Sequence, residues 1–212
     1  MAVVSQPTDP NCDVPQPGAV DAELGEFWVG NPWEIFETKN LSAFERNRLF
    51  MNVGGRAFLD VSYVSGADSD GDGRSAIAAD FDNDGRLDLA VRQAGGGALL
   101  IYENQFSQRN YLTVDLMGTR SNRLGVGARL IARVGERQIV RKRYPANTFN
   151  SAAPLAVHFG LGDAERVDEL TILWPSGERQ TLRDLDAGRH IEIVEGDAAI
   201  RVVTPGKTRS PR

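Results

Sequence analysis

The chain has 212 residues, enough for one large or two small domains with a core of their own. Its net charge is −5, and residues 66–90 alone carry seven aspartates against two arginines, so the acidity is local and the remainder is balanced. This distribution favours a cation as ligand and argues against nucleic acid as the principal partner. A single cysteine, Cys12, excludes an internal disulfide framework.

The chain begins Met-Ala-Val-Val-Ser-Gln-Pro, without the basic and apolar regions of a signal peptide, and no later run reaches membrane-spanning length. We therefore expect either a cytoplasmic protein or one from which a signal has been removed. An exposed Asp-rich loop suits the high calcium concentration outside cells, which favours an extracellular, periplasmic or cell-envelope location.

The first part of the chain contains three distinct segments. Residues 1–26 are rich in proline and poor in apolar residues, which predicts an extended arm that reaches a partner subunit. Residues 27–36 crowd aromatic and aliphatic side chains together, either as a buttress of the same domain or as a partner interface. Ser42 followed by Glu45 forms a capping-box pattern and predicts a short helix through Leu49.

The most informative stretch is Asp-Phe-Asp-Asn-Asp-Gly-Arg-Leu-Asp, residues 80–88, between two predicted strands. Carboxylates at its first, third, fifth and ninth positions can direct oxygens at one hard cation, and the glycine at the sixth permits a tight turn. The twelfth position is Val91, where a helix-loop-helix site has a glutamate, so a strand-loop-strand site is expected. The predicted Ca²⁺ ligands are the carboxylates of Asp80, Asp82, Asp84 and Asp88 and the backbone carbonyl of Arg86.

A preceding stretch repeats the first half of this pattern with Asp68, Asp70 and Asp72, and then departs from it at Ala76. Two interpretations stay open: these aspartates bind a second ion, or they form a hydrated turn that adds ligands to the first site. For the longer loop, the alternative to a calcium site is a solvated Asp/Gly turn without an ion.

From Phe50 onward the pattern is one of strands, and after Asn104 the strands become longer and predict an antiparallel sandwich or barrel. Gly135-Glu136 and the turn at residues 175–177 are predicted hairpin connections. The expected domains are an arm at 1–26, an aromatic segment, short helix and single β repeat at 27–104, a β-sandwich at 105–196 and a tail at 197–212.

Other residues that commonly carry chemistry lack the necessary neighbours. His158 lies within an apolar strand pattern, and His190 begins the last predicted strand. Cys12 has no base or basic cluster near it in sequence, and Ser176 lacks the glycine two residues before it that a nucleophile elbow requires. No catalytic residue is predicted.

A basic strip runs through the predicted sandwich. It is interpreted either as the solvated outer face of a hairpin or as a surface for an anionic glycan or an acidic partner. Nucleic acid is disfavoured because aromatic residues are not interleaved with the basic ones. The strip consists of Arg129, Arg133, Arg137, Arg141 and Arg143.

These motifs resemble two known families. The stretch from Phe58 to Leu89 is similar to an FG-GAP/VCBS-type repeat. The later part resembles the ASPIC/UnbV domain of cartilage-acidic-protein-like proteins, with an upstream match at residues 46–50. The resemblance implies a secreted or envelope-associated, calcium-binding protein with one blade-like repeat packed on a β-sandwich. Its motifs are Ser121-Asn122-Arg123, Gly125-Val126-Gly127-Ala128-Arg129, His158-Phe159-Gly160-Leu161-Gly162 and Trp174-Pro175-Ser176-Gly177.

The chain departs from that family in its number of repeats. Family members usually carry several, thought to build a seven-bladed propeller, whereas this sequence has one full repeat and one half-formed loop. Its strand edges and aromatic side chains are therefore expected to be covered by the sandwich, by residues 27–36 or by another subunit.

Two functions from different classes follow. The first is a non-enzymatic, calcium-binding module that binds protein subunits or an anionic glycan and takes part in an oligomer or larger assembly. The second is a metal-dependent enzyme, or its accessory subunit, that acts on a polysaccharide or a phosphoester.

Overall fold

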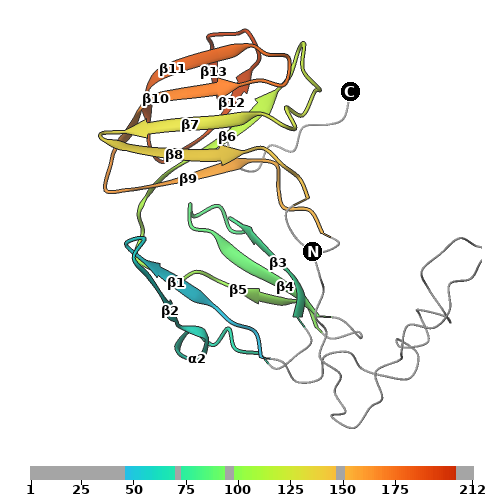
Figure 1. The fold of residues 1–212 in the computed structure, drawn as a ribbon, viewed down its shortest axis with the longest axis vertical. Helices are drawn as coiled ribbons and strands as arrows, with labels where there is room; N and C mark the ends of the chain where they lie inside the picture. The colour runs from blue at the N-terminus through green and yellow to red at the C-terminus, as the bar shows by residue number, and fades with distance from the viewer. Residues whose placement is uncertain (1–45, 70–72, 94–97, 147–150, 204–212) are drawn as a thin grey trace, which may run out of the picture. The chain divides into compact units, whose positions relative to one another are not determined.

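The computed structural model of the chain describes residues 46–69, 73–93, 98–146 and 151–203, and strands dominate them (Figure 1). This confirms the mainly β fold class. The described residues divide into two compact units. The first unit consists of the described residues within 46–74 and 92–98, and the second of those within 75–91 and 99–203. Over these same ranges, no helix has the length and apolar character needed to cross a membrane.

The first unit is built around an antiparallel hairpin of β1 (Phe50–Val53) and β2 (Ala57–Asp60). Gly54 and Gly55 have φ angles of 61° and 73°, which let the chain reverse direction between the strands. Every residue of both strands is exposed, and Phe58 keeps 68% of its surface exposed. Within the first unit, the described residues therefore leave this apolar hairpin uncovered.

Residues 46–49 form no helix, so the predicted helix through Leu49 is wrong over this part, and its expected start lies outside the described residues. The Leu49 carbonyl accepts the Val61 N–H at 2.9 Å, and the Leu49 N–H donates to the Ser62 hydroxyl at 2.8 Å. These long-range bonds use the groups that a helix would pair four residues apart. The helix that the structure does describe, α2, is the single turn Ser62–Ser65.

A three-stranded sheet follows in the order β3 (Gly73–Ala79), β4 (Asp88–Gln93) and β5 (Leu100–Tyr102). Strands β3 and β4 flank the Asp-rich stretch, as predicted from the apolar runs on either side of it. Most of this sheet belongs to the same compact unit as the strands that come after it.

Two four-stranded sheets make up the rest of the second unit, in the orders β11-β10-β7-β8 and β13-β12-β6-β9 (Figure 1). Their inward side chains form one buried cluster in which Phe159, Leu112, Leu130 and Leu170 have no exposed surface, as a sandwich requires. The strands are β6 (Asn110–Met117), β7 (Arg129–Val134), β8 (Arg137–Lys142), β9 (Val157–Gly162), β10 (Arg166–Leu173), β11 (Arg179–Asp186), β12 (Arg189–Val194) and β13 (Ile200–Val202).

One strand pair departs from the antiparallel prediction. Strands β6 and β12 run parallel, with Val114 opposite Ile191. Parallel neighbours need a long connection, and here the strands β7 to β11 lie between them in sequence. Alternation along a strand predicts its buried face but not its neighbour, so the sequence pattern could not distinguish the two directions.

The tight turns lie where the sequence predicts them. Gly135-Glu136 joins β7 to β8, and residues 174–178 join β10 to β11. Gly135 and Gly177 have φ angles of 57° and 89°, which favour glycine at both places. Part of the predicted tail is a strand, because β13 pairs with β12.

Trp174 closes the core at the end of β10. Its side chain is 4% exposed and belongs to the same cluster as Phe159 and Ile191, as the sequence predicts. The indole N–H donates to Gln180 Oε1 at 2.9 Å, so the polar atom of the ring is satisfied inside the fold.

We expect Trp174→Ala to lower the free energy of unfolding by about 3–5 kcal/mol, because it removes a packed ring and leaves a cavity. Trp174→Phe is the control, since it keeps most of the packing but loses the bond to Gln180. Urea denaturation measures both. A cost below about 1 kcal/mol for the alanine variant would contradict the packed position.

Candidate metal centre

The candidate site is the loop of residues 80–87, which connects β3 to β4. The last residue of β3, Ala79, is buried, and the first residue of β4, Asp88, is 4% exposed. The two strand ends therefore fix both ends of the loop, and the alternating aspartates lie between them.

The carboxylates of Asp80, Asp82 and Asp84 converge. Each offers one oxygen, and these three oxygens lie within 4.8 Å of one another. Three negative charges so close together repel one another unless a cation neutralises them. The structure thus brings together three of the four predicted carboxylate ligands, and their oxygens suit a hard cation such as Ca²⁺.

Hydrogen bonds within the loop orient these carboxylates. The Asp84 N–H donates to Asp80 Oδ1 at 3.0 Å and to Asp82 Oδ1 at 3.1 Å. The Gly85 N–H donates to Asp80 Oδ2 at 3.0 Å. The Arg86 N–H donates to Asp84 Oδ1 at 2.7 Å. Aspartate side chains that bond the backbone a few residues later wind the chain into a turn, so the loop is shaped by the groups that would bind the ion.

The start of β6 supports the loop. Gly85 has a φ of 89°, and a Cβ there would lie 2.0 Å from Tyr111 Cε1, so both the backbone and the space require glycine. The Gln108 side-chain amide donates to the Asp84 carbonyl at 2.9 Å. The Tyr111 ring in turn stacks on His158, with ring centroids 5.6 Å apart. Sequence reasoning identified the glycine but missed Gln108 and Tyr111, because no local pattern marks a contact so distant in sequence.

The charges of the loop reach these rings. Burial raises the pKa of the Tyr111 phenol, and the carboxylates of Asp80 and Asp84 raise it further. Burial lowers the pKa of His158, although Asp80 acts in the opposite direction. His158 is therefore neutral near pH 7 and packs as part of the strand, in keeping with the structural role predicted for it.

Asp88, the fourth predicted carboxylate ligand, has a different position. Its Oδ2 accepts the Phe81 N–H at 3.2 Å, and its Oδ1 accepts the Asn104 N–H at 2.8 Å. The residue lies outside the converging group formed by the three other aspartates. Asp88 therefore braces the loop and the chain after β5, and its role as a metal ligand stays a prediction.

The remaining predicted ligands divide in the same way. The Arg86 guanidinium contacts the Asp84 carboxylate, so this arginine balances part of the charge of the loop. In the half-formed loop, Asp68 pairs with Arg46 at 2.7 Å, whereas Asp70 and Asp72 lie outside the described residues. The described residues thus assemble a single cluster of carboxylates.

The five arginines of the predicted basic strip do not share one surface. Arg143 is buried: its guanidinium donates to the carbonyls of Leu124 at 2.5 Å and Leu155 at 2.9 Å and pairs with Asp115 at 3.2 Å. The prediction that Arg143 lies on the strip is therefore wrong, since a buried arginine with these partners is part of the core framework.

Strand alternation separates the other four. Arg137 and Arg141 lie on the inner side of the edge strand β8, where Arg137 donates to the Leu161 carbonyl at 2.8 Å and Arg141 lies over the Phe159 ring at 6.0 Å. Arg129 and Arg133 are exposed and face outward from β7. Reading the arginines as one strip ignored that successive residues of a strand point to opposite faces.

His190 is part of a half-buried network. Its Nε2 lies 2.9 Å from Asp115 Oδ2, and Arg143 contacts the same carboxylate. Burial alone would raise the pKa of Asp115, but the hydrogen bond from His190 and the charge of Arg143 together lower it. This carboxylate joins β6 to β12 across the parallel pair.

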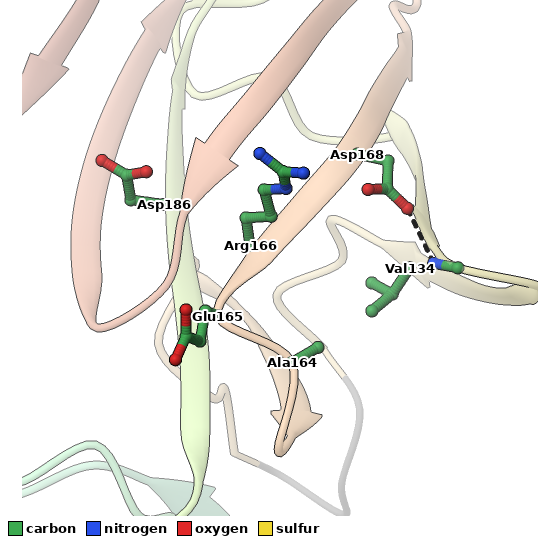
Figure 2. A pocket seen from close by; sticks show the side chains of 7 residues that line it. Val134, Ala164, Glu165, Arg166, Asp168 and Asp186 are labelled. Atoms are coloured by element: carbon green, nitrogen blue, oxygen red, sulfur yellow. Dashed lines mark hydrogen bonds between the residues drawn. The ribbon is translucent and has the colours of Figure 1, made fainter.

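A shallow depression lined by acidic residues lies at one end of the sandwich (Figure 2). The depression is lined by Glu165, Asp168 and Asp186 around Arg166. Figure 2 shows Asp168 and Asp186 on either side of Arg166, with Asp168 turned toward the β7–β8 turn, where it accepts the Gly135 N–H at 2.7 Å. Asp186 pairs with Arg189 at 2.5 Å. Asp168 and Asp186 are thus engaged by different groups, and among the described residues the three carboxylates do not form a second converging group.

The Glu195 carboxylate accepts hydrogen bonds from residues of two sequence motifs of the second unit, those that contain Ser121 and Ser176. Its Oε2 accepts the N–H groups of Thr119, Arg120 and Ser121 at 2.7–2.8 Å. Its Oε1 accepts the hydroxyls of Ser121 at 2.8 Å and Ser176 at 2.5 Å. Burial alone would raise the pKa of the Glu195 carboxyl, but these hydrogen bonds outweigh it and lower the pKa to about 2.

The fold and the loop define a β-rich protein in which an acidic strand-loop-strand repeat precedes a β-sandwich. Residues 35–91 match a family profile described as FG-GAP-like repeat, and residues 118–200 match one described as ASPIC and UnbV. The chain therefore carries an FG-GAP-like repeat followed by an ASPIC/UnbV domain, as the motifs predicted. No curated protein matches the chain at a significant level.

We expect Gly85→Ala to destabilise the second unit, because the new methyl group meets the Tyr111 ring and the backbone is held at a positive φ. A loss of about 2 kcal/mol or more in chemical unfolding is the expected result. The double variant with Tyr111→Ala is the control, since it removes the clash and isolates the backbone strain. Equal stability of Gly85→Ala and wild type would contradict the close contact.

We expect Glu195→Gln to lower the free energy of unfolding by about 1–3 kcal/mol at pH 7, because charged hydrogen bonds are lost. The folded pKa lies below the usual 4.5, so the charge stabilises the fold fully above pH 4.5, and this contribution is lost as the pH falls toward 2. The difference between wild type and variant should therefore shrink over that range. A constant difference from pH 7 to pH 2 would show that the charge is not responsible.

Proposed function

We propose that this protein is a non-enzymatic, calcium-binding β module that acts outside cells or in the cell envelope by binding a partner. The observation that carries the proposal is the convergence of Asp80, Asp82 and Asp84 in a loop wound by its own hydrogen bonds. Calcium would be held by these carboxylates, with the Arg86 carbonyl as a further oxygen ligand, and would neutralise their mutual repulsion.

Calcium suits this loop better than magnesium. Calcium accepts six to eight oxygens in a flexible arrangement, whereas magnesium demands a nearly ideal octahedron and keeps several waters. The loop offers three carboxylates on a short turn, and Asp82 is exposed, so water is free to complete the coordination. Three carboxylates give a modest affinity, which fits the high calcium concentration outside cells and supports the proposed location.

The exposed apolar side chains of the first unit support a role in assembly. Phe58 and Leu59 of β2 keep 68% and 51% of their surface exposed, and Tyr63 of α2 keeps 85%. Clustered exposed apolar residues often mark an interaction surface. We propose that this hairpin contacts another subunit or another segment of the same protein.

Asp82→Asn tests the calcium site. An asparagine oxygen can still accept the Asp84 N–H, so the loop keeps its turn while losing one charged ligand. Wild type should gain about 5–10 °C in melting temperature when calcium is about 100-fold above its dissociation constant, lose this gain with chelator, and respond less to magnesium. The variant should show little of this response. An equal calcium response in the variant would contradict the site, and a calcium-dependent hydrolysis lost in the variant would favour an enzyme.

Asp88→Asn is the matched control, because it removes one charge from the same stretch at a residue that braces the loop. We expect it to lower the free energy of unfolding by about 1–3 kcal/mol with or without calcium, since one carboxylate oxygen becomes an amide that cannot accept a backbone N–H. The calcium-dependent shift should persist. Loss of that shift would restore Asp88 as a ligand.

A further inference from the structure

Figure 1 shows the sheet β11-β10-β7-β8. The strand pairing places a row of cations, contributed by three of its strands, on its outer face. Residues directly opposite each other on antiparallel strands point to the same face. Arg129 of β7 lies opposite Lys142 of β8 and Leu173 of β10, and Leu173 lies opposite Arg179 of β11. Because Leu130, next to Arg129, is fully buried in the core, this row points outward.

Among the described residues, no acidic side chain pairs with the cation row, which consists of Lys142, Arg129 and Arg179. All three side chains belong to exposed residues, and none forms an ion pair with another residue in the described ranges. With strands about 4.8 Å apart, the row spans about 14 Å across the sheet. Arg129 and Lys142 are like charges directly opposite each other, an arrangement that disfavours the fold and that an anion would relieve.

A second row on the same face shows the contrast. Arg133 and Arg183 lie opposite Glu169 from either side. Arg183 pairs with Glu169 at 3.0 Å, and Arg133 lies 3.6 Å from Asp168. Arginines of the same face are thus neutralised by acids of the fold in this row, whereas no acid occupies the cation row.

An aromatic side chain lies next to the cation row. Tyr144 is two residues after Lys142, and the strand pairing continues past β8 because the Gly127 N–H donates to the Arg143 carbonyl at 2.9 Å. Tyr144 therefore shares the outward face, and it keeps 62% of its surface exposed. Its ring adds a flat apolar surface beside the charges.

We propose that this face binds an extended anionic polysaccharide, with its sulfate or carboxylate groups on the cation row and a sugar ring on Tyr144. The inference rests on the proposed binding role and names the chemistry of the partner. The calcium loop takes no part in the contact.

The form of the surface favours a glycan over other anions. A protein partner needs a desolvated centre with large apolar or aromatic anchors in pockets. The row beside the cation row holds only β-branched side chains and no aromatic anchor; its members are Val140, Ile131, Thr171 and Thr181. Single-stranded nucleic acid needs several stacking platforms, and Tyr144 is a single ring at the edge. A linear row of separate charges matches a polymer with regularly repeated anionic groups.

The test compares two double variants of the full chain on immobilised heparin in calcium-containing buffer. Arg129→Gln with Arg179→Gln should weaken binding about tenfold or more, because it removes two uncompensated cations. Arg133→Gln with Arg183→Gln removes the same charge from the same face, but from paired residues, and should change affinity less than about threefold. Equal losses in the two variants, or binding by neither wild type nor variants, would overturn the proposal.

Three further measurements sharpen the result. Lys142→Glu should raise the melting temperature, because it places opposite charges across β7 and β8, and should weaken heparin binding; stronger binding would overturn the proposal.

Neutral dextran should not bind, and poly-L-glutamate should bind more weakly than heparin, since equal binding would indicate an acidic protein partner. Asp82→Asn should retain heparin binding even when its calcium response is lost, so the two proposals fail separately.

Discussion

The sandwich depends on one buried carboxylate, that of Glu195, which lies just past the end of β12 and accepts five hydrogen bonds. Its backbone N–H also pairs with Met117 at the end of β6, so the carboxylate is placed at the end of the parallel strand pair. From there it fixes the N–H groups of the loop after β6 and the Ser176 hydroxyl of the β10–β11 turn. Because three N–H groups and two hydroxyls point at one site, an uncharged apolar side chain there would leave several partly buried donors without partners.

This arrangement gives a physical reason for the motifs that mark the second unit. Ser121 contributes both an N–H and a hydroxyl to Glu195, and Asn122 closes its own loop by accepting the Val126 N–H at 2.9 Å. Gly125 has a φ of 62° and lies so close to Leu116 and the Trp174 ring that a side chain would have little room. The motifs are thus explained by hydrogen bonding and close packing, and a sequence match to them predicts the fold without predicting a reaction.

The features that depend on local sequence patterns could be predicted from the sequence. Alternation predicted the strands and the burial of Trp174, and glycine spacing predicted the tight turns and the bend at Gly85. Prediction from the sequence failed where the partner is distant in sequence. The Leu49 backbone forms hydrogen bonds with Val61 and Ser62 in place of the expected helix. Strand β6 pairs with β12, which comes near the end of the second unit. The candidate site shows the same limit, since three aspartates were identified from spacing while Asp88 is engaged by the Asn104 N–H, well beyond the loop.

The charged groups of the second unit fall into two kinds, and the difference bears on function. Glu195, Arg143 and Asp88 are nearly inaccessible and are matched by hydrogen bonds or opposite charges, so they stabilise the fold. The aspartates of the 80–87 loop and the cation row on the outer sheet are accessible, and each set places like charges close together. Repulsion of this kind weakens a fold, and stability alone would favour mixed charges at both places. This repulsion occurs at two separate places, one negative and one positive, and it supports our proposals that each place binds a ligand of the opposite charge.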